Sequence, residues 1–295
     1  MASPEYEAFF ATIQSQKTGA TPTLEELRQA MDAIAMVVPA PEGTMVEPVD
    51  AGGVPAEWVS APNVTSDRVV LYLHGGGYAI GSPAMVRNFV ARLSASADAR
   101  VLSVDYRLGP EHPFPAAVDD AVIAYHWLVA QGHPPERIAV SGESAGGGLT
   151  VAMLLALKQR RDQLPAAAVP ISPWFDMEIA GDISEDADKV DGLTRGHLEH
   201  FRTWYLGEGD RRAPLANPLH ADLDGLPPML ILVGEREILL DDARRFVSKA
   251  QDAGINIDLE IVPEMIHIWH LFGPMFPEAN AASDRVGAYI RERTA

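Results

Sequence analysis

The sequence has no cysteine among its 295 residues, which excludes disulfide frameworks, thiol nucleophiles and thiolate-bound metals. It also has no run of 18 or more apolar residues, so we expect no membrane span. Residues 1–11 are acidic and helix-like, without the basic start and the apolar stretch of a signal peptide. We therefore expect a cytoplasmic location.

Basic residues are scarce, because 23 Lys and Arg stand against 41 Asp and Glu, for a net charge of −18. Such a surface repels phosphate backbones and anionic lipid head groups, so nucleic acid and membrane surfaces are poor partners. The content of 47% hydrophobic and 22% charged residues is typical of a soluble globular protein with a large core. The length fits one α/β domain with a modest accessory part.

Short apolar runs rich in Val, Ile and Leu alternate with helical stretches along most of the chain. Near-continuous runs of this kind are typical of strands buried on both faces, and the alternation predicts a mostly parallel sheet with right-handed crossovers. The predicted strands are Met45–Val49, Ala56–Ala61, Val69–Leu73, Val101–Val104, Ile138–Val140, Ala167–Ile171, Met229–Val233 and Ile257–Val262. The predicted helices between them are Pro83–Ala97, Pro115–Ala130, Ala145–Arg161 and Asp241–Ala253.

Two regions interrupt the alternation. Residues 1–45 contain two helical stretches with no strand between them, and Thr23 caps the second. Residues 178–216 are too long for an ordinary loop and contain a helical pattern at 197–206. Ligands bind at the carboxyl edge of open α/β sheets. We therefore predict that 1–45 and 178–216 form a helical cap over a catalytic domain made of 46–177 and 217–295.

The strongest chemical signal is Gly-Glu-Ser-Ala-Gly at residues 142–146, which follows a predicted strand and opens a predicted helix. This is the context of a nucleophile elbow, a strained turn that exposes the serine hydroxyl. Gly142 and Gly146 avoid side chains that would clash where the strand and the helix nearly touch. The helix N-terminus also places partial positive charge beside a forming oxyanion. The pattern predicts Ser144 as a nucleophile.

Three glycines follow another predicted strand, in His-Gly-Gly-Gly-Tyr at residues 74–78. Their N–H groups can turn inward and stabilise a tetrahedral oxyanion, although flexible loops and anion-binding turns are also glycine-rich. Their place before the elbow favours an oxyanion hole with the N–H groups of Gly75, Gly76 and Ala145 as donors. We expect His74 to be a structural residue, because the general base comes last in this arrangement.

The base and the orienting acid must follow the serine in the order acid, then histidine. His267 comes just after the last predicted strand, and its rival His270 is expected to lie in the next helical turn. Residues 234–242 hold four candidate acids, Glu235, Glu237, Asp241 and Asp242. The two aspartates are better explained as first-turn acids of the following helix, where the helix dipole favours them.

At these residues the chain resembles the hormone-sensitive lipase family of esterases, bacterial family IV. The HGGG loop is His74–Gly77, and the family's GDSAGG elbow corresponds to Gly142–Gly147. A third motif, Asp105–Ala116, reads DYRLGPEHPFPA and is close to the family's DYRLAPEHPFPA. Ser172-Pro173-Trp174 is also similar, and the resemblance runs from about residue 46 to the end of the chain.

The chain departs from the family at three motif positions. Glu143 replaces the usual Asp, and Gly109 replaces an Ala. The family's acid motif Asp-Pro-Leu corresponds to residues 237–239, Glu-Ile-Leu, so the resemblance implies Glu237 as the triad acid. It also implies that Asp105–Ala116 is scaffolding that braces the catalytic loops.

The resemblance implies an α/β-hydrolase fold, with a mostly parallel eight-stranded sheet, flanking helices and a helical cap. It implies hydrolysis of short- to medium-chain carboxylic esters by Ser144, His267 and Glu237, with no cofactor and no metal. A lactone hydrolase would use the same site and stays open. A ligand-binding receptor on an inactive scaffold is disfavoured, because the triad positions are filled. The expected partner is a small-molecule ester, and the dimers common among similar esterases leave a homodimer open.

Overall fold

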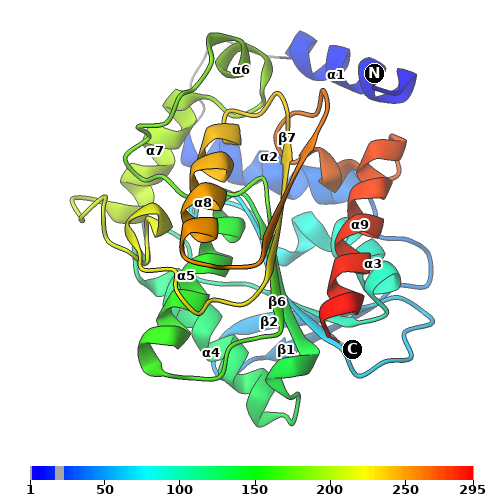
Figure 1. Cartoon of the computed structure of the whole chain (residues 1–295). Coiled ribbons are helices and arrows are strands. Elements are labelled where there is room, and N and C mark those ends of the chain that lie inside the picture. Colours follow the sequence, from blue (N-terminus) through cyan, green and yellow to red (C-terminus); the bar gives the residue numbers. More distant parts are fainter. Residues whose placement is uncertain (1, 17–22, 295) are drawn as a thin grey trace.

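The computed structural model describes residues 2–16 and 23–294 and shows one eight-stranded sheet with helices on both faces (Figure 1). The strands follow the spatial order β1-β2-β4-β3-β5-β6-β7-β8. Strand β2 runs antiparallel to β1 and to β4, and the other neighbouring pairs are parallel. The strands are β1 (Met45–Asp50), β2 (Pro55–Ser60), β3 (Val69–Leu73), β4 (Arg100–Val104), β5 (Ile138–Glu143), β6 (Ala167–Ile171), β7 (Met229–Gly234) and β8 (Ile257–Val262). The predicted fold class is confirmed.

Helices cover both faces of the sheet, which explains why the central strands are apolar along their whole length. One face packs against α4 (Ala116–Ala130), α5 (Ala145–Arg160) and α8 (Leu240–Asp252). The other packs against α3 (Pro83–Ala97) and α9 (Pro277–Arg293). All residues from 145 to 157 of α5 are buried, so this helix is enclosed on every side.

The C-terminal helix α9 is the main element that the sequence analysis did not predict. Its stretch of Ala, Glu and Arg after Pro277 is typical of a helix with proline in its first turn, so a signal was present. Helix α9 contacts α3, and Val286 and Ile290 on its buried side are fully enclosed. The predicted strands all form, with ends that shift by up to three residues.

The two regions that interrupt the alternation are helical. Residues 1–45 contain α1 (Pro4–Gln16) and α2 (Leu24–Val37), and 178–216 contain α6 (Glu185–Val190) and α7 (Arg195–Leu206). Thr23 caps α2 as predicted: its hydroxyl accepts from the Glu26 N–H, and the Glu26 carboxylate accepts from the Thr23 N–H. Figure 1 places α1 and α6 beyond one end of the sheet, near the top of the view. Within 2–16 and 23–294, no helix is long and apolar enough to cross a membrane.

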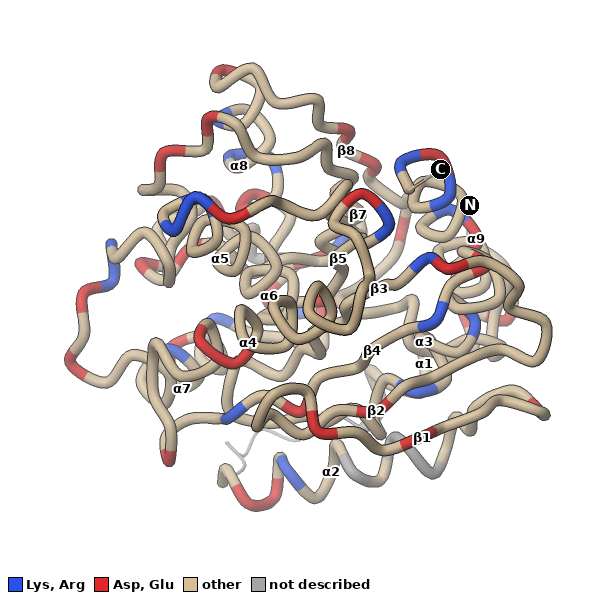
Figure 2. Tube along the Cα trace, turned by 90° about the horizontal axis from the view of Figure 1, so that it is seen from below, with Lys and Arg blue, Asp and Glu red and all other residues tan. Residues whose placement is uncertain are grey.

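Strand register brings the catalytic motifs to one edge of the sheet. Leu73 at the end of β3 pairs with Gly142 in β5, and Glu143 pairs with Ile171 at the end of β6. The loops after β3, β5 and β6 therefore leave the sheet side by side, and the loops after β7 and β8 follow at the same edge. Acidic and basic positions are interspersed over helices and loops throughout the molecule (Figure 2).

Candidate active site

Ser144 occupies a strained turn between β5 and α5. Its backbone has φ 57° and ψ −120°, a conformation that L-residues with side chains rarely adopt. A Cβ on Gly142 would lie 2.4 Å from the Leu73 carbonyl oxygen, and one on Gly146 would lie 1.9 Å from the same atom. Both glycines are therefore required by the close approach of β3, as predicted, and the serine hydroxyl is turned toward the cavity.

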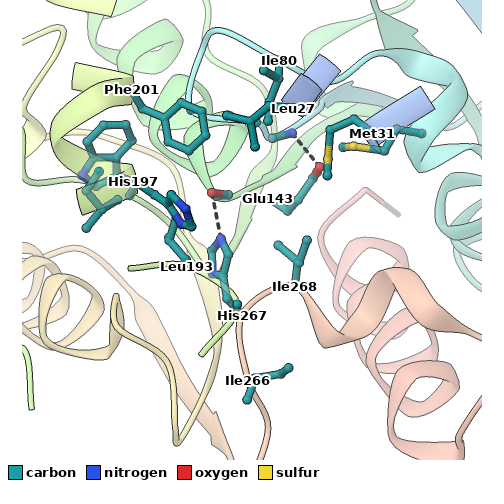
Figure 3. Close-up of a pocket in the computed structure, with 18 of the residues that line it drawn as sticks. Leu27, Met31, Ile80, Glu143, Leu193, His197, Phe201, Ile266, His267 and Ile268 are labelled. Atoms are coloured by element: carbon teal, nitrogen blue, oxygen red, sulfur yellow. Dashed lines mark hydrogen bonds between the residues drawn. The ribbon is translucent and has the colours of Figure 1, made fainter. Parts of the chain in front are cut away.

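Three side chains from three loops form one hydrogen-bonded chain. Ser144 Oγ lies 2.9 Å from Nε2 of His267, and Nδ1 of His267 lies 2.9 Å from Oε2 of Glu237 (Figure 3 shows the serine–histidine contact). Each of the three side chains is less than a tenth exposed. The structure thus brings together the three residues selected from the sequence.

Burial acts to lower the pKa of His267, but the hydrogen bond to Glu237 and its charge outweigh that effect. The charges of Asp191 and Glu143 add to the same side, so the pKa of His267 lies above its ordinary value. Negative charge around the ring therefore stabilises the imidazolium form. A base that becomes cationic during catalysis gains from that environment.

Glu237 is held by contacts beyond the histidine. Its Oε1 accepts from the Ser172 hydroxyl at 2.7 Å and from the Gly234 N–H at 2.6 Å. Ser172 belongs to the Ser-Pro-Trp sequence that follows β6, which gives that family-like segment a contact with the acid. Because both carboxylate oxygens are engaged, Glu237 is fixed in position and oriented toward His267.

The three rival acids lie elsewhere. Glu235 is exposed and accepts from the Glu264 N–H at 3.1 Å. Asp241 is in the first turn of α8, as predicted, and accepts from the Asp182 N–H. None of them contacts His267 through any hydrogen bond of the described residues, so Glu237 alone of the four is placed to orient it.

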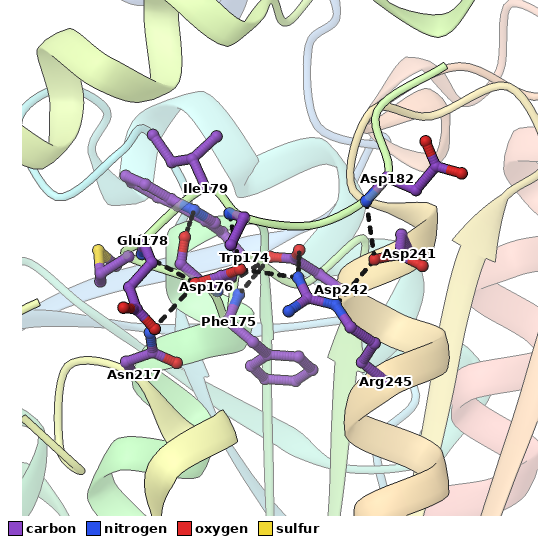
Figure 4. Close-up of polar contacts among 12 residues, drawn as sticks. Trp174, Phe175, Asp176, Glu178, Ile179, Asp182, Asn217, Asp241, Asp242 and Arg245 are labelled. Carbon is purple, nitrogen blue, oxygen red and sulfur yellow. Dashed lines mark hydrogen bonds and ion pairs between the residues drawn. The ribbon is translucent and has the colours of Figure 1, made fainter. Parts of the chain in front are cut away.

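Asp242 also lies in the first turn of α8, as predicted, but it makes further contacts that the sequence did not indicate. It is 7% exposed, and its Oδ2 accepts from the N–H groups of Phe175 and Asp176 (Figure 4). Its Oδ1 pairs with Arg245 at 2.9 Å. Burial, together with the charge of Asp176, raises the pKa of Asp242 to about 6. Asp242 therefore fixes the segment after β6 to α8.

Two further histidines, His74 and His270, are buried beside the catalytic loops. His270 lies in a 3-10 turn at 269–272, and its ring packs edge-on against Phe89. Burial lowers the pKa of His270 to about 3. Burial lowers the pKa of His74 to about 4. His74 Nδ1 lies 2.7 Å from the Gly75 carbonyl oxygen, and its ring stacks on Tyr106. His270 therefore lies in a helical turn, as expected, and the burial of His74 fits the structural role expected for it.

Two backbone N–H groups beside the serine are unused, one in the glycine loop and one at the start of α5. Among the described residues, no acceptor pairs with the backbone N–H of Gly76 or of Ala145. The Gly75 N–H, by contrast, donates to Oε1 of Glu143 (Figure 3). Of the three predicted oxyanion donors, Gly76 and Ala145 are therefore available in this structure, and Gly75 is engaged.

Glu143 is completely buried next to the nucleophile. Its Oε2 accepts from the Tyr72 hydroxyl at 2.6 Å, and Oε1 accepts from Gly75. Burial raises the pKa of Glu143 to about 7, although these hydrogen bonds act to lower it. Glu143 has a longer side chain than the Asp usual in the family, and its carboxylate links Tyr72 of β3 to Gly75 of the glycine loop.

A cavity of about 300 Å³ opens over Ser144 and His267. Its wall is mostly apolar and combines both interrupting regions with the catalytic loops (Figure 3). Residues 1–45 contribute Phe9, Ile13, Leu27 and Met31, and residues 178–216 contribute Gly192, Leu193, His197, Leu198 and Phe201.

The segment Asp105–Ala116 braces the site, as the resemblance implied. Tyr106 donates to the His74 carbonyl oxygen at 2.6 Å, and Arg28 of α2 pairs with Glu111 at 2.7 Å. The structure explains why Gly109 stands where the family has Ala. A Cβ at this position would lie 2.3 Å from the Trp204 carbonyl oxygen near the end of α7.

One buried side chain close to the triad was missed from the sequence. Asp191 follows α6, is fully enclosed, and accepts from the backbone N–H groups of Ile238 and His267. Its neighbours 184–190 are rich in acidic residues, so nothing in the sequence distinguishes Asp191 from the exposed acids around it.

Comparison with known proteins supports the fold and the class of enzyme. Residues 70–271 match a protein family described as having the alpha/beta hydrolase fold. An acetyl-hydrolase from Streptomyces hygroscopicus is 43% identical, over 100% of this chain and 98% of its own. An esterase from Acinetobacter venetianus is 33% identical, over 87% of this chain and 85% of its own.

A crystal structure of an esterase from the bacterial hormone-sensitive lipase family superposes with a TM-score of 0.96, at 42% identity and with complete coverage of both chains. The fold, the motifs and these relatives lead to one assignment. The chain belongs to the hormone-sensitive lipase family of α/β-hydrolases and is a carboxylesterase.

Proposed function

We propose that this esterase hydrolyses short- to medium-chain acyl esters through an acyl-enzyme on Ser144. The observation that carries the proposal is the unbroken hydrogen-bonded chain Ser144–His267–Glu237, buried at the base of an apolar cavity. Nucleophile, base and orienting acid within hydrogen-bond reach of one another are the requirement for this chemistry.

In the first step, Ser144 Oγ attacks the ester carbonyl carbon while Nε2 of His267 takes the hydroxyl proton. The carbonyl π electrons move to its oxygen, and the N–H groups of Gly76 and Ala145 are the donors available to that oxyanion. Gly75 becomes a third donor only if its N–H leaves Glu143. Collapse of the intermediate breaks the bond to the alcohol oxygen, which leaves with the proton from His267.

In the second step, a water molecule attacks the acyl-enzyme carbonyl while His267 takes one of its protons. Collapse of this intermediate releases the carboxylic acid, and His267 returns the proton to Ser144 Oγ. Glu237 keeps the Nδ1 proton directed toward itself throughout, so Nε2 is free to act as the base.

The size and chemistry of the cavity support an acyl group of limited length. A volume of about 300 Å³ is at the small end of ligand pockets. Its apolar wall favours an alkyl chain over a charged one. A related esterase, 41% identical with a TM-score of 0.96, has been soaked with p-nitrophenyl butyrate. We therefore place the acyl optimum at short to medium chains.

We further propose that 1–45 and 178–216 act as the cap and set the length of the acyl group. The support is that both regions supply apolar wall residues opposite the triad. Phe201 of α7 lies against Gly77, where a glycine Cβ would be 2.2 Å from the ring. The cap therefore packs directly on the glycine loop, which holds Gly76, one of the two available donors.

Ser144→Ala tests the function. Loss of the nucleophile should reduce kcat by roughly 10⁴- to 10⁶-fold while the thermal unfolding transition stays in place. A serine-reactive phosphonate should label the wild type at Ser144 and leave the variant unlabelled. Activity retained by the variant, or an adduct on another residue, would show that the nucleophile has been misassigned.

A further inference from the structure

Asp191 is a fully buried carboxylate that the triad mechanism does not use. Its Oδ1 accepts from the backbone N–H of His267 at 2.8 Å, and its Oδ2 accepts from the backbone N–H of Ile238 at 2.9 Å. Ile238 directly follows Glu237 in the chain. One side chain from the segment after α6 therefore spans the loop that carries the acid and the loop that carries the base.

These two hydrogen bonds set the spacing between the catalytic loops. The loop after β7 and the loop after β8 must hold Glu237 and His267 within hydrogen-bond distance, and small misplacements of catalytic groups are costly. A charged acceptor forms stronger bonds to N–H groups than a neutral one, and burial strengthens them further. Asp191 is therefore well suited to hold both loops at once.

Three other elements place ionisable groups around Asp191: Glu237 and His267 on the two catalytic loops, and Tyr6 on α1. Burial raises the pKa of Asp191 to about 6; His267 lowers it and Glu237 raises it. In return, the Asp191 charge raises the pKa of His267. The ionised carboxylate thus favours the imidazolium that forms during catalysis.

We propose that Asp191 is a positioning residue: it holds the Glu237 and His267 loops in register and so makes the segment 178–216 part of the catalytic assembly. The inference rests on the proposed triad function. It adds a carboxylate that never touches substrate and is absent from the cavity wall.

The test compares three purified variants, Asp191→Asn, Asp191→Glu and Asp186→Asn. Asp186 is the matched control, because it lies on α6, is 74% exposed at its side chain and approaches Arg236 only to 3.8 Å. Active sites are counted with a serine-reactive phosphonate, so that kcat refers to folded sites. The pH profile of kcat/KM is then measured with p-nitrophenyl acetate.

Asp191→Asn should lower kcat roughly 10- to 100-fold with KM nearly unchanged, because one amide oxygen cannot accept from both N–H groups. The acidic limb of its pH profile of kcat/KM should move to lower pH, because loss of the Asp191 charge lowers the pKa of His267. Asp191→Glu should keep the acidic limb at the wild-type pH, because the charge is retained. Its kcat should still fall, because the longer side chain cannot accept from both N–H groups in the same geometry. Asp186→Asn should match the wild type in both measurements.

A merely structural role would reduce the number of titrated sites and leave kcat per site and the limb unchanged, and that result would overturn the inference. If Asp191→Asn does not fold, Asp191→Glu alone decides: a wild-type kcat refutes the inference, and a reduced kcat with an unmoved limb supports it. The proposed function has its own test. If Ser144→Ala stays active, the triad assignment fails; if that variant is inactive while Asp191→Asn behaves like the control, only this inference fails.

Discussion

Replacement of Glu237 by Gln tests the acid of the triad with almost no change in shape. Oε1 of Glu237 accepts from the Gly234 N–H and from the Ser172 hydroxyl, and Oε2 accepts from His267 Nδ1. An amide has one acceptor oxygen, and the Gly234 N–H requires it. The amide NH₂ must then face Nδ1 of His267. Because the NH₂ group only donates, Nδ1 must be unprotonated to accept this hydrogen bond.

That arrangement moves the ring proton to Nε2, which faces Ser144 Oγ at 2.9 Å. The histidine can then no longer take the serine proton. The consequence is the wrong-tautomer loss seen when the orienting acid of a serine triad is made neutral, roughly 10⁴-fold in kcat. At about 1.4 kcal/mol for each tenfold change, this corresponds to ~5.5 kcal/mol of transition-state stabilisation.

The assay is kcat with p-nitrophenyl acetate, per phosphonate-titrated site, for Glu237→Gln and for Glu235→Gln as its control. Glu235 lies two residues earlier, is exposed, and accepts a single N–H at 3.1 Å, so its variant should stay within about tenfold of the wild type. KM should change little in either variant. The reasoning would be refuted by a Glu237→Gln enzyme within tenfold of wild type, and more strongly if Glu235→Gln were the inactive one.

Four further predictions use other parts of the structure. Gly109→Ala should lower the melting temperature by an amount equivalent to about 1–3 kcal/mol, because its Cβ overlaps the Trp204 carbonyl oxygen; an unchanged melting curve contradicts this. Asp242→Asn should reduce the free energy of unfolding by about 1–3 kcal/mol at pH 8, measured in urea, with kcat within tenfold of wild type. Because the folded-state pKa of Glu143 is raised to about 7, its protonated form contributes stability that is present below pH 4.5 and is lost as the pH rises through 7. The free energy of unfolding of the wild type in urea should therefore fall by roughly 2–3 kcal/mol more between pH 5 and 8 than that of Glu143→Gln. Deletion of residues 1–40 should flatten the dependence of kcat/KM on acyl length more than it changes acetate hydrolysis, whereas an unaltered length profile would exclude a cap role.

The sheet was predictable from the sequence because each buried strand is a short apolar run bounded by turn residues. Val69–Leu73 and Met229–Val233 can be identified on that basis alone. The antiparallel placement of β2 between β1 and β4 could not be read from the sequence, because pairing partners depend on tertiary packing. Helix α9 was not predicted, although Pro277 in its first turn and its Ala, Glu and Arg content are typical of a helix.

The residues of the proposed active site could be selected from the sequence for a different reason. The elbow and the glycine loop need glycines wherever backbones approach closely, and the sequence records those glycines directly. A buried carboxylate leaves no such record. In the sequence, Asp191 and Asp242 look like their less buried neighbours Asp188 and Asp241. Only the fold shows which of these acids accept backbone N–H groups in the interior.

We propose that the segment 178–216 is part of the active site as well as a cap over it. Its contacts reach three segments around the site. Phe201 contacts the glycine loop at Gly77, the Trp204 carbonyl oxygen approaches Gly109 of the bracing segment, and Asp191 accepts from the His267 N–H. Two of these contacts leave no room for a side chain on the partner. A change in the position of this segment therefore acts on the oxyanion donors and on the triad together, so its variants should alter kcat as well as the choice of ester.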